Sequence, residues 1–205
     1  MHVQIVLFDG FDPLDVVAPF EVLVAGSDAL AVEFVTADGP RTVTSGSRGL
    51  QLAASGTLDP HRAGYILVPG ASGPVDGDPD AETVPVLLGR FANSAAMPLL
   101  TEAFADPTVT VATVCGGSLA LAMAGLLHGR NAVTHALGMD MLAAAGANAV
   151  RARVVDDGDL ISSGGVTSGI DLALYLLERE FGPRVAHAVE ELFEFERRGT
   201  VWRDI

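Results

Sequence analysis

Cys115 is the only cysteine of the chain, and its surroundings suit a reactive nucleophile. It follows the strand-like run VTVATV directly, and the small residues Gly-Gly-Ser then open a helix. A side chain on so tight a turn is presented at the end of a sheet, beside the next backbone amides. The start of the helix should also favour thiolate over thiol and so lower the pKa of Cys115. Burial as a small apolar side chain explains this local pattern about equally well.

A second strand-like run ends in VPGASG, residues 68–73. Backbone of this kind can approach a ligand closely, because its side chains are small. The amides of Gly70 and Ala71, together with that of Gly116, could therefore stabilise a developing anion. An ordinary turn between a strand and a helix is the simpler interpretation of this segment alone.

Titratable and polar side chains lie at other expected strand ends. Asp15 follows the first strand on the first turn of an apolar helix, where a capping role is the alternative to a catalytic one. Glu21 is a weaker candidate because it lies further along that helix. His135 follows another strand and could exchange a proton, although a structural role is at least as plausible. Thr167 and Ser168 are further candidates for the lining of a site.

The chain lacks the sequence signatures of several reaction classes. The chain has no Gly-x-Gly-x-x-Gly dinucleotide fingerprint, no Walker loop and no paired Cys/His spacing. We therefore expect neither a metal nor a nucleotide cofactor.

The elements that must position these residues alternate between short apolar runs and helical runs. Strands are predicted at 3–8, 32–36, 65–68, 109–114, 131–134, 153–155 and 160–162. Helices are predicted at 14–25, 83–104, 118–127, 137–145, 168–181 and 183–196, with a short hairpin at 42–52 and a surface loop at 74–82. This alternation predicts a single α/β domain over 1–205, with a doubly wound, mostly parallel sheet. Ligands of such sheets bind beyond the carboxyl ends of the strands.

Length and charge narrow the choice of partners. A chain of 205 residues fits one domain, and its formal net charge of −14 disfavours nucleic acid and anionic membranes. Residues 1–12 lack the features of a signal peptide, which predicts a cytoplasmic protein. The apolar stretch 109–127 contains threonine, glycine and serine at its middle, so we expect a strand and a helix there and not a membrane span.

Four blocks together resemble the DJ-1/PfpI superfamily and, within it, the isocyanide hydratase group. They are LFDGFDPLDVVAPFEVL (7–23), VCGGSLALAMAGLL (114–127), AVTH (132–135) and DGDLISSGGVTSGIDLAL (157–174). The resemblance implies a flavodoxin-like fold, a homodimer, no cofactor and a small-molecule substrate. It also implies that Cys115 is the nucleophile and that Asp15 is its carboxyl partner.

Hydratases of this group add water to an isocyanide and give an N-substituted formamide. They have threonine after the cysteine and a Gly-Gly pair after the proline, whereas this chain has Gly116 and Ala71 at those places. Peptidase-like members have histidine directly after the cysteine. Because Gly116 stands there, neither proteolysis nor a glyoxalase reaction that depends on that histidine is expected.

Ligand or redox sensing is the alternative from another class. A related group fuses this domain to an AraC-type DNA-binding region, but the chain stops at Ile205 and has the wrong charge for DNA. A stand-alone stress protein remains open, in which Cys115 oxidises to a sulfinate or a ligand binds without turnover. Another small-molecule hydrolase activity is also open.

Overall fold

One eight-stranded sheet forms the centre of the molecule, in the order β12-β10-β11-β7-β6-β1-β2-β5. The computed structural model describes residues 1–77 and 81–204. The strands are β1 (His2–Val6), β2 (Ala31–Thr36), β5 (Gly56–Thr57), β6 (Gly64–Val68), β7 (Val109–Thr113), β10 (Val154–Asp156), β11 (Leu160–Ser163) and β12 (Trp202–Arg203). Neighbouring strands are parallel except for β10 and β11. The predicted doubly wound, mostly parallel sheet is confirmed.

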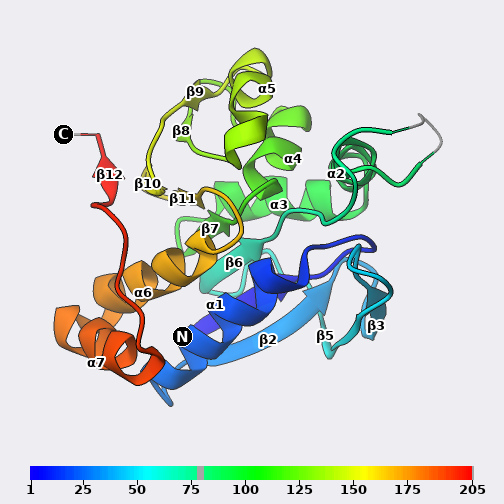
Figure 1. Ribbon diagram of the computed structural model, residues 1–205. Coiled ribbons are helices and arrows are strands. Elements are labelled where there is room, and N and C mark those ends of the chain that lie inside the picture. The colour runs from blue at the N-terminus through cyan, green and yellow to red at the C-terminus, as the bar shows by residue number, and fades with distance from the viewer. Residues whose placement is uncertain (78–80, 205) are drawn as a thin grey trace.

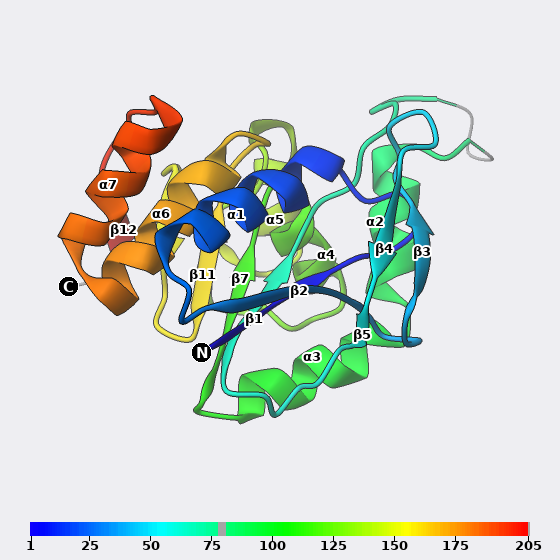
Figure 2. The same cartoon turned by 90° about the horizontal axis from the view of Figure 1, so that it is seen from below.

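Helices cover both faces of this sheet (Figures 1 and 2). On one face α1 (Pro13–Gly26) packs against α6 (Ser168–Phe181), and α6 packs against α7 (Pro183–Phe193). The other face carries α2 (Val84–Ala92), α3 (Ala96–Ala105) and α4 (Gly117–Met123), with α5 (Met139–Ala144) beyond α4. Strands enclosed on both sides need continuous apolar sequence, which explains why Val3, Ile5 and Ile66 are fully buried.

The chain reverses its direction of winding between β1 and β6. From β1 it moves outward to β2 on one side, and it later returns to build β6, β7 and β11 on the other. In open sheets the crevice at such a reversal is where ligands bind. The turns after β1, β6 and β7 meet at this crevice, and they carry Asp15, Gly70 and Cys115.

Four predicted helices are shorter or divided. The run 137–145 is a 3-10 turn (Ala136–Gly138) followed by α5, and the run 183–196 ends as α7 at Phe193. The run 83–104 forms α2 and α3, because an Asn-Ser pair ends the first helix. The Asn93 amide donates to the Arg90 carbonyl at 3.2 Å and the Ser94 amide to the Phe91 carbonyl at 3.0 Å, while Ser94 Oγ accepts the Ala96 amide at 3.3 Å. The run 118–127 is helical only to Met123, since the chain then turns through Gly125 at a φ of 81°.

The predicted strand 131–134 does not join the central sheet. β8 (Asn131–Ala132) pairs instead with β9 (Asn148–Ala149) in a separate two-stranded sheet. Both edges of β11 are already occupied by β7 and β10, so no position remains for β8 beside it. The predicted hairpin 42–52 is confirmed as the antiparallel pair β3 (Arg41–Thr44) and β4 (Gln51–Ala54).

The apolar stretch 109–127 is a strand, a turn and a short helix, as predicted. Its helix, α4, has seven residues. Within residues 1–77 and 81–204, no helix combines the length and the apolar character that a membrane crossing requires.

Gly117→Ala tests how tightly α4 is seated on the sheet. A Cβ at Gly117 would lie 2.3 Å from the backbone oxygen of Val68, so α4 would have to move off β6. We expect the free energy of unfolding to fall by about 2–3 kcal/mol, measured by urea denaturation. The control is Gly89→Ala in α2, where the new Cβ meets only Met123 Cε at 3.5 Å. That variant should be unchanged or more stable by about 0.5–1 kcal/mol. Equal effects of both substitutions would contradict this account.

Candidate active site

Cys115 has a backbone conformation that residues other than glycine rarely adopt. Its φ is 54°, in the left-handed region where non-glycine residues are uncommon. Backbone contacts hold it there: its amide donates to the carbonyls of Ser163 (3.2 Å) and Gly164 (2.9 Å), and Thr134 Oγ1 donates to its carbonyl at 2.6 Å. The predicted tight turn between strand and helix is therefore present, and only 8% of Cys115 is exposed.

Asp15 lies next to the thiol and is completely buried. It is not the cap of α1, because Asp12 occupies that position and accepts the Leu14 amide at 2.9 Å. The Gly70 amide donates to Asp15 Oδ2 at 2.9 Å. Within the described part of the chain, Asp15 Oδ1 is buried without a hydrogen-bond partner. A buried, incompletely satisfied carboxyl favours its protonated form.

Burial raises the pKa of both acidic groups. The pKa of Asp15 rises to about 8. Burial is the largest cause and the charge of Asp12 the next, while hydrogen bonds from the Gly70 amide and the Cys115 thiol lower the pKa by less. For Cys115 the pKa rises to about 12, through burial and then the charge of Asp15, although the amides of Gly116 and Val166 oppose this. The expected lowering of the cysteine pKa at the helix start is therefore wrong. Since each group affects the other, the two titrate as a pair, and this pair keeps its first proton well above the ordinary range of a carboxyl.

The predicted anion-binding amides are only partly available. The Gly70 amide orients Asp15, so it cannot also receive an incoming anion. The Gly116 amide faces the sulfur. Among the described residues, no hydrogen-bond acceptor is found for the Ala71 amide, which lies in an isolated bridge opposite Phe11.

The turns after β6 and β7 touch through glycine. A Cβ at Gly70 would lie 2.6 Å from the Gly116 nitrogen and 3.0 Å from Asp15 Oδ2. A Cβ at Gly116 would lie 2.9 Å from Leu88 Cδ1, so Leu88 fills the space that a larger residue after the cysteine would need. Residues 70 and 116 are therefore restricted by close packing.

The hairpin of β3 and β4 closes the same region from outside. The Gly46 amide donates to the Phe11 carbonyl at 3.1 Å, and Ser47 Oγ lies 2.9 Å from Ser72 Oγ. A Cβ at Gly46 would overlap the Ser72 carbonyl oxygen at 1.6 Å. The hairpin thus holds the turns after β1 and β6 together.

A pocket of about 190 Å³ opens above Cys115. Most of its walls are apolar. They comprise Ala71, Val75, Val84, Pro85, Leu88, Leu119, Leu137, Met141 and Val166, with Asp12, Ser72, Gly73, Gly116, Thr134, His135 and Gly138 completing the lining. Asp12, Leu88 and Val166 were not predicted. The Asp-Pro-Leu start of a helix could have indicated Asp12 as a cap, whereas Leu88 and Val166 carry no sequence signal.

The remaining predicted site residues divide into two groups. His135 lines the pocket, and its Nδ1 accepts the Leu137 amide at 3.2 Å. Thr167 is exposed and binds Arg153 through Oγ1 at 3.1 Å, while Ser168 lines a different hollow beside Gly165. Neither residue contributes to the pocket. Glu21 is exposed on α1.

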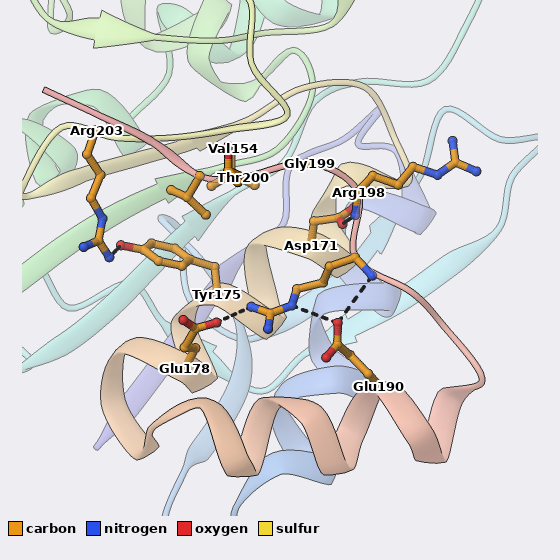
Figure 3. Close-up of a pocket in the computed structure, with 11 residues that line it drawn as sticks. Val154, Asp171, Tyr175, Glu178, Glu190, Arg198, Gly199, Thr200 and Arg203 are labelled. Carbon is orange, nitrogen blue, oxygen red and sulfur yellow. Dashed lines mark hydrogen bonds and ion pairs between the residues drawn. The ribbon is translucent and has the colours of Figure 1, made fainter.

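A larger hollow of about 580 Å³ lies under the C-terminal segment (Figure 3). Its charged side chains bind one another. Arg197 pairs with Glu178 and with Glu190 at 2.8 Å, and Arg203 binds the hydroxyl of Tyr175. These pairs fasten the segment to α6 and α7, so we assign the hollow a structural role. Among the described residues, no group of three or more His, Cys, Asp or Glu is arranged to hold a metal.

Comparisons with known proteins agree on family and fold. The family model described as DJ-1/PfpI family matches residues 1–179. The isonitrile hydratase of Pseudomonas putida is 33% identical over 95% of this chain and 78% of its own length. A ThiJ/PfpI family protein of Pseudomonas syringae has a crystal structure that superimposes with a TM-score of 0.80 at 25% identity, over 97% of this chain and 76% of that one. The predicted flavodoxin-like fold is confirmed.

A regulator is also among the relatives. The HTH-type transcriptional regulator CdhR of Pseudomonas aeruginosa is 28% identical over 93% of this chain. The match covers 54% of the length of that regulator. The comparisons thus include both an enzyme and an HTH-type transcriptional regulator.

Asp15→Asn tests the raised pKa of the buried carboxyl. Asp15 holds its proton more tightly in the folded chain, at a pKa of about 8, than at its ordinary value of 3.8. Its contribution to stability is therefore complete below about pH 4 and is lost as the pH rises to about 8. We expect the stability difference between wild type and Asp15→Asn to fall across this range by at most about 1.4 kcal/mol per pH unit. Urea denaturation at several pH values measures it, and a constant difference would contradict the assignment.

Proposed function

The chain belongs to the DJ-1/PfpI family, and we propose that it is a cysteine-dependent enzyme that adds water to an isocyanide and releases an N-substituted formamide. The observation that carries the proposal is the pairing of Cys115, on its strained turn, with a fully buried Asp15 that retains its proton. Similarity to the Pseudomonas putida isonitrile hydratase supports the choice of reaction. An uncharged isocyanide also suits the apolar walls of the pocket.

In the first step, Cys115 adds to the terminal carbon of the isocyanide. The new bond uses an electron pair of the sulfur, the thiol proton passes to Asp15, and Asp15 delivers a proton to the same carbon. The product is a thioimidate, R–N=CH–S–Cys115. The amides of Gly116 and Val166 stabilise negative charge on the sulfur during the attack.

In the second step, water releases the product. Its oxygen bonds to the thioimidate carbon, and the nitrogen gains one proton. The carbon–sulfur bond then breaks with its electron pair on sulfur, while Asp15 moves the hydroxyl proton to the leaving thiolate. The formamide R–NH–CHO leaves, and both side chains return to their initial protonation states. Neither step requires a cofactor.

Ligand or redox sensing is the second candidate, and the regulator among the relatives favours it. In this reading Cys115 would be oxidised or would line a binding pocket without turnover. The pKa of Cys115 argues against oxidation, because a buried thiol with a pKa of about 12 contains little thiolate near neutral pH.

Turnover of para-nitrophenyl isocyanide tests the hydratase proposal, with formamide production followed by chromatography. Wild type should turn over this compound. Cys115→Ala should lose activity to background, and Asp15→Ala should lose about a hundredfold or more, because proton transfer is lost. Glu21→Gln removes an exposed carboxylate from the same helix and should retain activity. Inactive wild type would refute the reaction, and an active Cys115→Ala variant would refute the nucleophile.

Peroxide treatment at pH 7 separates the enzyme from the redox sensor. Since Cys115 is protonated and only 8% exposed, peptide mass analysis should show that it oxidises far more slowly in the folded protein than in urea. Urea-unfolded protein provides the reactive control, since its thiol is exposed. Rapid gain of two oxygen atoms by the folded protein would favour the sensor.

A further inference from the structure

The geometry points to Asp12 as a specificity-determining residue that makes the Cys115 pocket select uncharged, compact, apolar electrophiles and exclude anionic ones. This inference rests on the proposed hydratase function only where it concerns isocyanides. The selection itself is a property of the pocket and of Cys115.

The size and walls of the pocket favour a compact apolar substituent. Its volume of about 190 Å³ is below the roughly 300–1,000 Å³ of sites for drug-sized ligands. Leu88 and Leu119 are buried at 1% and 5% exposure, and Val84, Leu137, Met141 and Val166 add further apolar surface. A substituent that displaces water from these side chains gains free energy by burying apolar area.

The charge of the lining is negative. Asp12 contributes a carboxylate, and the described lining contains no lysine or arginine. His135 Nδ1 offers no hydrogen bond to a ligand, because it accepts the Leu137 amide at 3.2 Å. An anionic substituent would therefore lose its hydration without gaining a cationic partner.

Asp12 holds its charge in a fixed position at this wall. Its side chain accepts the Leu14 amide at 2.9 Å, and its own amide donates to the Gly70 carbonyl at 2.9 Å. These bonds tie the carboxylate to both the start of α1 and the turn that orients Asp15. Its influence extends to the reacting groups, since its charge raises the pKa of both Asp15 and Cys115. A fixed charge at a partly desolvated site acts more strongly than a mobile surface charge.

Asp12→Asn isolates this charge from the fold. Asparagine caps helices as well as aspartate does, so the first turn of α1 should be retained. Glu21→Gln is the matched control, because it removes one carboxylate from an exposed position of the same helix. Circular dichroism and the urea midpoint should show that both variants are folded.

The probe is alkylation of Cys115 by neutral iodoacetamide and anionic iodoacetate at pH 8, followed by intact mass. The chain has one cysteine, so each adduct reports on this site. The ratio of the two rates cancels the thiolate fraction, which the substitution also changes. In wild type, the ratio of the iodoacetamide rate to the iodoacetate rate should be about tenfold higher than for free cysteine. In Asp12→Asn this ratio should fall by about threefold to tenfold. In Glu21→Gln it should stay at the wild-type value.

Three results would overturn the inference. They are an unchanged ratio in Asp12→Asn, an equal change in Glu21→Gln, and a Cys115 that neither reagent modifies in the folded protein. A turnover comparison of methyl isocyanoacetate with the isocyanoacetate anion gives the link to function, and Asp12→Asn should improve the anion relative to the ester. If the alkylation ratios shift as expected while neither isocyanide reacts, the hydratase proposal fails and the charge selection stands.

Discussion

The contact between the turns that follow β6 and β7 is the constraint on which the site depends. Gly70 lies too close to Gly116 to carry a Cβ, and a Cβ at Gly116 would meet Leu88; in this arrangement the Gly70 amide reaches Asp15 while the Gly116 amide reaches the sulfur. The sheet determines how near the two turns can come, because β6 and β7 are adjacent parallel strands. The geometry around Cys115 is thus a consequence of strand order and of glycine at two positions.

Burial gives this pair of acids its character. When a thiol and a carboxyl share a buried site, ionising both costs much free energy, because no water separates the two negative charges. One proton therefore remains between Cys115 and Asp15 well above neutral pH. Such a pair can move a proton between sulfur, substrate carbon and water without a histidine, which fits a chain with glycine directly after its cysteine.

The parts of the site that follow strand ends were predictable from sequence, because periodicity locates the carboxyl ends of parallel strands. Cys115, Asp15 and the turn at Gly70 belong to this class. Roles that depend on side-chain direction were not predictable: Gly70 binds Asp15, Thr167 turns toward Arg153, and Asp12 takes the cap expected of Asp15. The pKa of Cys115 was predicted in the wrong direction, because sequence shows the helix start and does not show burial beside a second acid.

The bonds from the Cys115 amide to Ser163 and Gly164 also connect the site to the order of folding. These carbonyls stand at the end of β11, which the ribosome delivers almost fifty residues after the cysteine. If β11 were not docked on β7, the Cys115 amide would lose both of its acceptors, and of these contacts only the bond from Thr134 would remain to hold the φ of 54°. A chain in which β11 has not yet docked would therefore hold Cys115 less firmly in its strained conformation.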